Sequence, residues 1–110
     1  MSSEPVNAAT VAELKDIVGD GIDEIIDAYV TDGRELIETM TEALSQSDCE
    51  KLRAASHQLK SSSANVGALV VSEMMKEIES HAKNGDVPSI SSVFSSAANE
   101  FDRVVEYFAA

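Results

Sequence analysis

The residues with the clearest chemical potential are a histidine and a lysine three positions apart, His57 and Lys60. On a helix this spacing places both side chains on one face, and Arg53 stands one turn before the histidine. A neutral imidazole is a nucleophile near neutral pH, and a nearby cation stabilises the charge on the oxygens of a phosphoryl group during its transfer. The three side chains are therefore suited to the acceptance of a phosphoryl group on nitrogen.

That phosphoryl group has to arrive on another protein. The sequence has neither a GxxxxGK[ST] loop nor a kinase-type glycine-rich loop with which to bind a nucleotide. A helical wheel places His57 opposite the residues that face inward, which are Leu52, Ala55, Leu59, Ser62 and Val66. We therefore expect a partner to dock on the outward face around His57, on a surface formed by Arg53, Ala54, Gln58, Ser61 and Ala64.

The segments on either side are patterned as helices that would support this face. A capping box from Thr10 to Glu13 predicts the start of a short helix, which the turn sequence after Val18 ends. Its apolar strip consists of Leu14, Ile17 and Val18.

A long helix is predicted next, with Asp20 as its N-cap and apolar residues in one phase as far as Leu44. Gly33 should weaken this helix without ending it. Three more helices are indicated by the apolar periodicity and the turn residues, over about 49–65, 70–82 and 90–108.

Four long helices with short links predict an all-α fold, because none of them can bury its apolar stripe alone. The expected architecture is an antiparallel up-and-down four-helix bundle with a short extra N-terminal helix. A chain of 110 residues suffices for one domain. We expect that domain to span residues 10–110, preceded by a flexible N-terminus over residues 1–9.

Charge and composition exclude several classes of partner. Twenty acidic residues against eight basic ones give a formal net charge of −12, which repels nucleic acids and anionic lipid surfaces. No apolar run approaches the length that spans a bilayer, and the first residues lack the pattern of a secretory signal. The sequence therefore predicts a cytoplasmic protein that binds neither nucleic acid nor a membrane. We also expect it to be a monomer.

The stretch from His57 to Lys60, the small residues after it and the pair Gly67-Ala68 resemble the histidine phosphotransfer (HPt) family of two-component phosphorelays. The resemblance implies that His57 accepts the phosphoryl group through Nε2 and that Lys60 stabilises its charge. It implies that the phosphohistidine relays the group between aspartates of receiver domains, in a hybrid sensor kinase or a response regulator. It also implies a phosphocarrier rather than a kinase, with no cofactor of its own and Mg²⁺ only in the partner receiver domain.

Two positions qualify the resemblance. The family usually has Gly directly after the lysine, where this chain has Ser61. Some family members have a Gln on the next helix that hydrogen-bonds near the active imidazole, and an ungapped count places Glu79 at that position. Glu79 is therefore the expected neighbour of His57.

Three other functions compete with phosphotransfer. A non-catalytic interaction module built on a helical bundle fits the composition and periodicity equally well, and only the grouping around His57 disfavours it. A serine hydrolase needs an orienting carboxylate and an oxyanion hole that the sequence does not reveal. The Glu-x-x-His pairs of a di-iron bundle are absent, and His81 is interpreted as a structural histidine at the edge of an apolar stripe.

Overall fold

Five α-helices and one short 3₁₀ turn make up most of residues 4–110, the part of the chain that the computed structural model describes. No strand occurs among these residues. The elements in chain order are α1 (Ala8–Val18), η1 (Gly19–Gly21), α2 (Ile22–Ser45), α3 (Cys49–Asn65), α4 (Leu69–Lys83) and α5 (Val87–Ala109).

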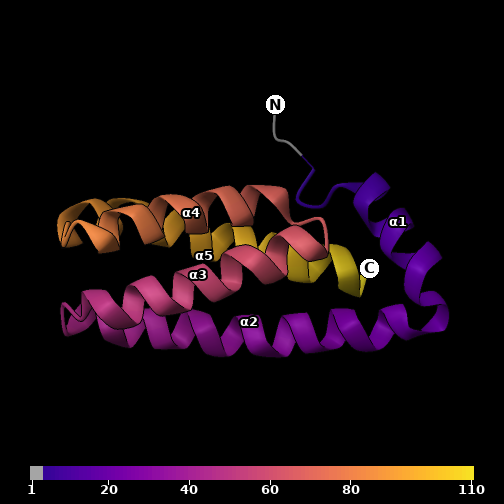
Figure 1. Ribbon diagram of the computed structural model, residues 1–110, viewed down its shortest axis with the longest axis horizontal. Helices are drawn as coiled ribbons and strands as arrows, with labels where there is room; N and C mark the ends of the chain where they lie inside the picture. Colours follow the sequence, from indigo (N-terminus) through magenta and orange to yellow (C-terminus); the bar gives the residue numbers. More distant parts are fainter. Residues whose placement is uncertain (1–3) are drawn as a thin grey trace.

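The four long helices run alternately up and down, and each lies beside two of the others (Figure 1). Helix α3 packs between α2 and α4, while α5 closes the bundle against α4 and α2. The short helix α1 crosses the end of the bundle where α2 begins (Figure 1). This is the antiparallel four-helix bundle with an extra N-terminal helix that the sequence predicted, so the fold class is confirmed.

The links between the helices are short and are stabilised by caps. Helices α3 and α5 are each preceded by an aspartate N-cap. Asp48 accepts a hydrogen bond from the backbone N–H of Lys51, and Asp86 accepts one from that of Ser89. Helix α3 ends before Gly67, whose φ of 83° lies in the region that favours glycine. These stops hold α3 and α4 antiparallel and adjacent.

The start of α1 and the segment before it differ from the prediction. Helix α1 begins at Ala8 and is capped by Asn7, whose side chain accepts a hydrogen bond from the backbone N–H of Thr10 at 3.0 Å. Thr10 is thus inside the helix and does not cap it. Val6 is buried, and the N–H of Asn7 donates to the carbonyl oxygen of Gly67 at 2.8 Å. The segment expected to be flexible therefore packs on the bundle from Val6 onward, while residues 1–3 lie outside the described part.

Three finer expectations also differ from the structure. Asp20 lies in the 3₁₀ turn and α2 begins at Ile22, so Asp20 is not its N-cap. Ile17 is exposed, because α1 contacts the bundle mainly through Val11 and Leu14. On α3 the buried serine near the C-terminus is Ser63, whereas Ser62, which was expected to face inward, is only half-buried.

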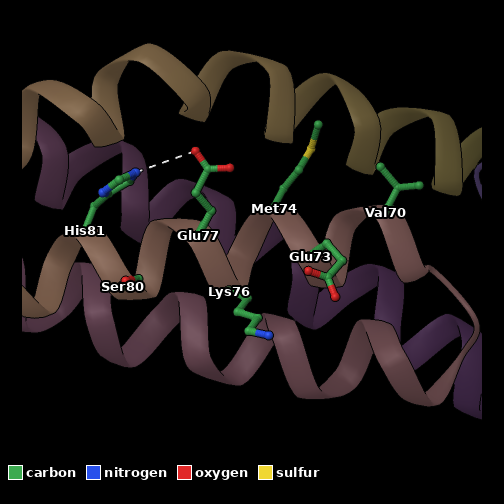
Figure 2. Close-up of a pocket in the computed structure, with 7 residues that line it drawn as sticks. All are labelled: Val70, Glu73, Met74, Lys76, Glu77, Ser80 and His81. Atoms are coloured by element: carbon green, nitrogen blue, oxygen red, sulfur yellow. Dashed lines mark ion pairs between the residues drawn. The ribbon is translucent and has the colours of Figure 1, made fainter.

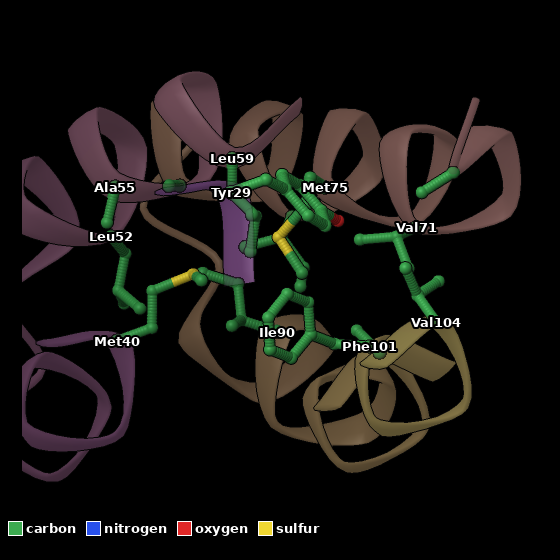
Figure 3. Close-up of a cluster of buried hydrophobic side chains, with 14 of the residues drawn as sticks. Tyr29, Met40, Leu52, Ala55, Leu59, Val71, Met75, Ile90, Phe101 and Val104 are labelled. Atoms are coloured by element: carbon green, nitrogen blue, oxygen red, sulfur yellow. The ribbon is translucent and has the colours of Figure 1, made fainter. Parts of the chain in front are cut away.

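The core consists of aliphatic, methionine and aromatic side chains from all four long helices (Figure 3). Its fully buried members include Met40 of α2, Leu52 and Leu59 of α3, Met75 of α4 and Ile90 of α5. Full burial of one such side chain contributes about 1.5–3 kcal/mol. Helix α3 is therefore anchored along its inner face, which fixes the direction of its outer face. No helix in residues 4–110 is both long and apolar enough to cross a bilayer.

Candidate functional site

His57 stands on the outer face of α3, and its side chain is 58 % exposed. The residues on either side of it in the helix hold its position. Ser56 is buried and donates a hydrogen bond to the carbonyl oxygen of Leu52 at 2.7 Å, and Leu59 is fully buried. The backbone of His57 is thus fixed by packing, while its imidazole remains accessible.

A carboxylate on the neighbouring helix holds one side of the imidazole. Oε2 of Glu79, on α4, lies 2.9 Å from Nδ1 of His57. Oε1 of the same carboxylate accepts a hydrogen bond from Nζ of Lys60 at 2.7 Å. Nζ of Lys83, one turn further along α4, lies 3.7 Å from Oε2. Glu79 is therefore the neighbour of His57, as expected from its position in the sequence.

Glu79 is ionised at neutral pH although it is 4 % exposed. The hydrogen bond from Lys60 is the largest cause that lowers the pKa of this carboxyl, and the hydrogen bond with His57 lowers it further against the opposing effect of burial. An ionised carboxylate can only accept hydrogen bonds, so the proton between the two groups belongs to Nδ1 of His57. In a neutral imidazole with its proton on Nδ1 the lone pair is on Nε2, and Nε2 of His57 forms no hydrogen bond with residues 4–110.

Among the described residues, no hydrogen bond joins Arg53 to the imidazole. Its guanidinium forms an ion pair with Glu50 one turn earlier, with Nε donating to the Glu50 carboxylate at 3.3 Å. That hydrogen bond is the main cause of the lowered pKa of Glu50. The positive charge next to His57 therefore comes from Lys60, whose side chain is 29 % exposed, and from Lys83.

The residues of the expected docking surface are exposed, apart from Arg53. Ala54, Gln58, Ser61 and Ala64 are all exposed on α3, and Arg53 is half-buried. Their side chains are short apart from Gln58 and Arg53, so the surface near His57 offers little steric hindrance. Whether a receiver docks on it stays a prediction.

Two contributions to the site had not been predicted from the sequence. Lys83 forms an ion pair with Glu79 from one turn further along α4. The spacing of four residues could have predicted this pair from the sequence, with Glu79 as the starting point. Ser72 of α4 donates a hydrogen bond to the carbonyl oxygen of Lys60 at 2.9 Å. This hydrogen bond joins α4 to α3 about one turn after His57, and no pattern in the sequence predicts it.

The second histidine has a different environment. Figure 2 shows His81, Glu77 and Met74 extending from α4 toward α5, along a shallow groove. Nε2 of His81 lies 3.5 Å from the Glu77 carboxylate, and Nδ1 lies 4.0 Å from that of Asp86. Both ring nitrogens of His81 thus face carboxylates, unlike those of His57.

Comparison with known proteins shows the family of the chain. The family model described as Hpt domain matches residues 24–107, most of the chain. The crystal structure of histidine-containing phosphotransfer protein B (HptB) from Pseudomonas aeruginosa PAO1 is similar, with a TM-score of 0.88 and 25 % sequence identity. The match covers 94 % of this chain and 92 % of that one. No curated protein sequence matches.

The chain belongs to the Hpt domain family. Its function is histidine phosphotransfer in a two-component phosphorelay, and it is a phosphocarrier rather than a kinase. Hpt domains interact with the receiver domains of response regulators and kinases. The resemblance stated from the sequence is thereby confirmed, and the non-catalytic interaction module is not favoured.

Proposed function

We propose that Nε2 of His57 is the atom that accepts the phosphoryl group. The observation that carries this proposal is the pairing of Nδ1 with the buried Glu79 carboxylate at 2.9 Å. The pairing fixes the tautomer whose Nε2 is nucleophilic, and it orients the ring on an accessible helix face. His81 has carboxylates 3.5 Å and 4.0 Å from its two ring nitrogens, so no single hydrogen bond fixes its tautomer in this way.

The reaction transfers the group from an aspartyl phosphate of a receiver domain. The Nε2 lone pair attacks phosphorus as the P–O bond to the aspartate breaks, and the aspartate leaves as a carboxylate. Lys60 binds the same carboxylate as the ring, and its ammonium can offset charge on the phosphoryl oxygens once it turns from Glu79. The surface of Arg53, Ala54, Gln58, Ser61 and Ala64 receives the partner.

Further parts of the proposal concern the setting of the reaction. The chain contributes no cofactor, and the Mg²⁺ that the chemistry uses belongs to the receiver domain. The chain acts as a cytoplasmic monomer between receivers of a hybrid sensor kinase and a response regulator. Sedimentation analysis and cell fractionation test the last two points.

The chemical stability of the label tests the site's chemistry. The chain is incubated with a receiver domain that carries a radiolabelled phosphoryl group, and then it is separated and treated with acid or base. Phosphohistidine predicts a label that acid removes and base does not. A label that resists acid would indicate a hydroxyl acceptor, and one that both treatments remove would indicate a carboxylate.

A further inference from the structure

We propose that Glu79 keeps the phosphorylated ring of His57 protonated at Nδ1, and so keeps its phosphoryl group ready to leave. This inference rests on the proposed role of His57 and adds a second step, the return of the group to a receiver. Glu79 acts as a positioning residue, because it touches the imidazole and does not touch the phosphoryl group.

The proton balance of the first step sets the requirement. Before transfer, Nδ1 of His57 carries a proton that it donates to Glu79, and Nε2 carries the lone pair. When Nε2 bonds to phosphorus, the ring retains the Nδ1 proton and becomes a cation. Loss of that proton would leave an Nδ1 lone pair facing a carboxylate oxygen at 2.9 Å. Two acceptors at this distance repel each other, so the carboxylate opposes deprotonation of the phosphorylated ring.

The same proton decides how well the ring leaves. When a receiver aspartate attacks phosphorus, the electron pair of the N–P bond returns to Nε2. A protonated ring then departs as neutral imidazole, whereas a deprotonated ring would have to depart as an imidazolate anion, which is a far poorer leaving group. Retention of the Nδ1 proton therefore maintains phospho-His57 as a donor when the pH rises.

The other charged groups around the ring modulate this effect without replacing it. Nζ of Lys60 lies 2.7 Å from Oε1 of Glu79, and Nζ of Lys83 lies 3.7 Å from Oε2, the oxygen that pairs with the ring. Arg53 interacts electrostatically with Glu79, although its own ion pair is with Glu50. Within residues 4–110, no ionisable group of α2 or α5 forms a hydrogen bond or ion pair with His57. Glu79 is thus the group to which the ring proton is coupled.

An amide at this position would behave differently. The carboxamide of Gln can accept a hydrogen bond from a protonated Nδ1 through its oxygen, or donate one to a bare Nδ1 through its nitrogen. It therefore tolerates both protonation states of the phosphorylated ring and selects neither. Glu79→Gln keeps the shape of the side chain while it removes the selection.

The test measures transfer from phospho-His57 to an unphosphorylated receiver as a function of pH. Wild-type chain and Glu79→Gln are each labelled by a phosphorylated receiver, freed of it, and mixed with fresh receiver between about pH 6 and pH 9. The matched control is Glu77→Gln, which removes a carboxylate two residues away that pairs with His81. We expect both variants to take label. The rate at which phosphorylated Glu79→Gln donates its phosphoryl group should decline at a pH about one unit or more below the pH at which the wild-type rate declines. At the alkaline end its rate should therefore be about tenfold below that of the wild type.

A second measurement covers the case in which Glu79→Gln folds poorly or takes little label. The ¹⁵N chemical shifts of the phosphorylated His57 ring in the wild-type chain report directly whether Nδ1 carries a proton. We expect a protonated Nδ1 at about pH 8. Coincident pH profiles for wild type and Glu79→Gln, or a bare Nδ1 at that pH, would overturn the inference while His57 remains the acceptor. A label found on another residue would instead refute the proposed acceptor and this inference with it.

Discussion

The ring of Phe101 on α5 packs directly on the backbone of Gly33 in the middle of α2. A Cβ atom at position 33 would overlap Cε1 and Cζ of that ring. Phe101 is itself fixed, because it is buried and its ring lies 5.8 Å from that of Tyr29 between centroids. The absence of a side chain at Gly33 thus lets α2 and α5 approach closely, and the glycine that weakens the helix is used for packing.

Gly33→Ala is therefore expected to destabilise the protein. Alanine is favoured over glycine in a helix interior by about 1 kcal/mol, but overpacking of a filled core costs typically 1–3 kcal/mol. We expect a net loss of about 1 kcal/mol in the free energy of unfolding, measured by urea denaturation. Gly21→Ala is the control, because nothing lies within 4 Å of its Cβ position. A more stable Gly33→Ala protein would show that the ring of Phe101 yields easily.

Much of this fold follows from the sequence because apolar residues recur at helical spacing and aspartates or glycines stand at the links. The periodicity could indicate that Gly33 is inside a helix, but it could not indicate that Phe101 lies over it. Contacts between residues distant in sequence depend on how the helices are rotated against one another. The predicted start of α1 was wrong for a similar reason. The backbone N–H of Asn7 donates a hydrogen bond to Gly67, which lies 60 positions later in the sequence.

The site was more accessible to prediction than the packing. His57 and Lys60 share one helix, so their relative position follows from helix geometry alone. Glu79 comes from the next helix, and only the family's pattern suggested it. Spacing predicts Arg53 near the imidazole, yet Glu50, three residues before it on the same helix, binds it instead. Spacing restricts the candidates for an ion pair, and competition between candidates decides which pair forms.

The buried hydroxyl of Tyr29 should give the fold an alkaline limit. Burial raises the pKa of Tyr29 to about 12, although the hydrogen bond with Ser63 at 2.8 Å opposes this rise. In the unfolded chain a tyrosine titrates near pH 10, so the unfolded state loses its proton first. The stabilisation from Tyr29 is therefore complete below about pH 10 and is lost as the pH rises toward about 12.

Tyr29→Phe should remove this dependence. At neutral pH we expect it to cost about 1 kcal/mol, because the hydroxyl of Ser63 loses its partner. Thermal melts of both proteins at several pH values between neutral and strongly alkaline measure the difference. The difference in stability between wild type and Tyr29→Phe should shrink or change sign as the pH rises. A difference that stays constant would contradict the role assigned to the burial of Tyr29.

Lys60→Ala is expected to slow phosphoryl transfer to His57 without preventing folding. The ammonium supplies positive charge one turn from the acceptor, and the loss of one such group costs about tenfold when it is partly exposed to solvent. Rapid-quench measurements of receiver-to-chain transfer give the rate. Lys51→Ala serves as the control, because it removes the same charge near the start of α3. Equal rates for the two variants would remove Lys60 from the mechanism.

Bulk at Ser61 should matter more than its polarity. Ser61 is exposed one turn after His57, beside the path by which a receiver must approach. A displacement of only about 1 Å can cost about a hundredfold in rate. We expect Ser61→Gly to transfer at least as well as wild type, at a cost of about 0.5 kcal/mol in stability, and Ser61→Arg or Ser61→Phe to transfer poorly.

The control for these variants is Ser95→Phe, which adds the same bulk at an exposed position on α5. Thermal melts identify any variant that is merely unfolded. A fully active Ser61→Phe protein would place the docking surface elsewhere on the bundle.

The most direct test of the central claim is the stoichiometry of phosphoryl transfer to His57→Gln and His81→Gln. Each variant and the wild-type chain are incubated with an excess of labelled phospho-receiver, and the label on the chain is counted after separation. His57→Gln should fold with almost unchanged stability, since its side chain is largely exposed, and should take no label. His81→Gln should take label as the wild type does. A labelled His57→Gln protein, or a His81→Gln protein that stays unlabelled while folded, would contradict the assignment of His57 as the phosphoacceptor.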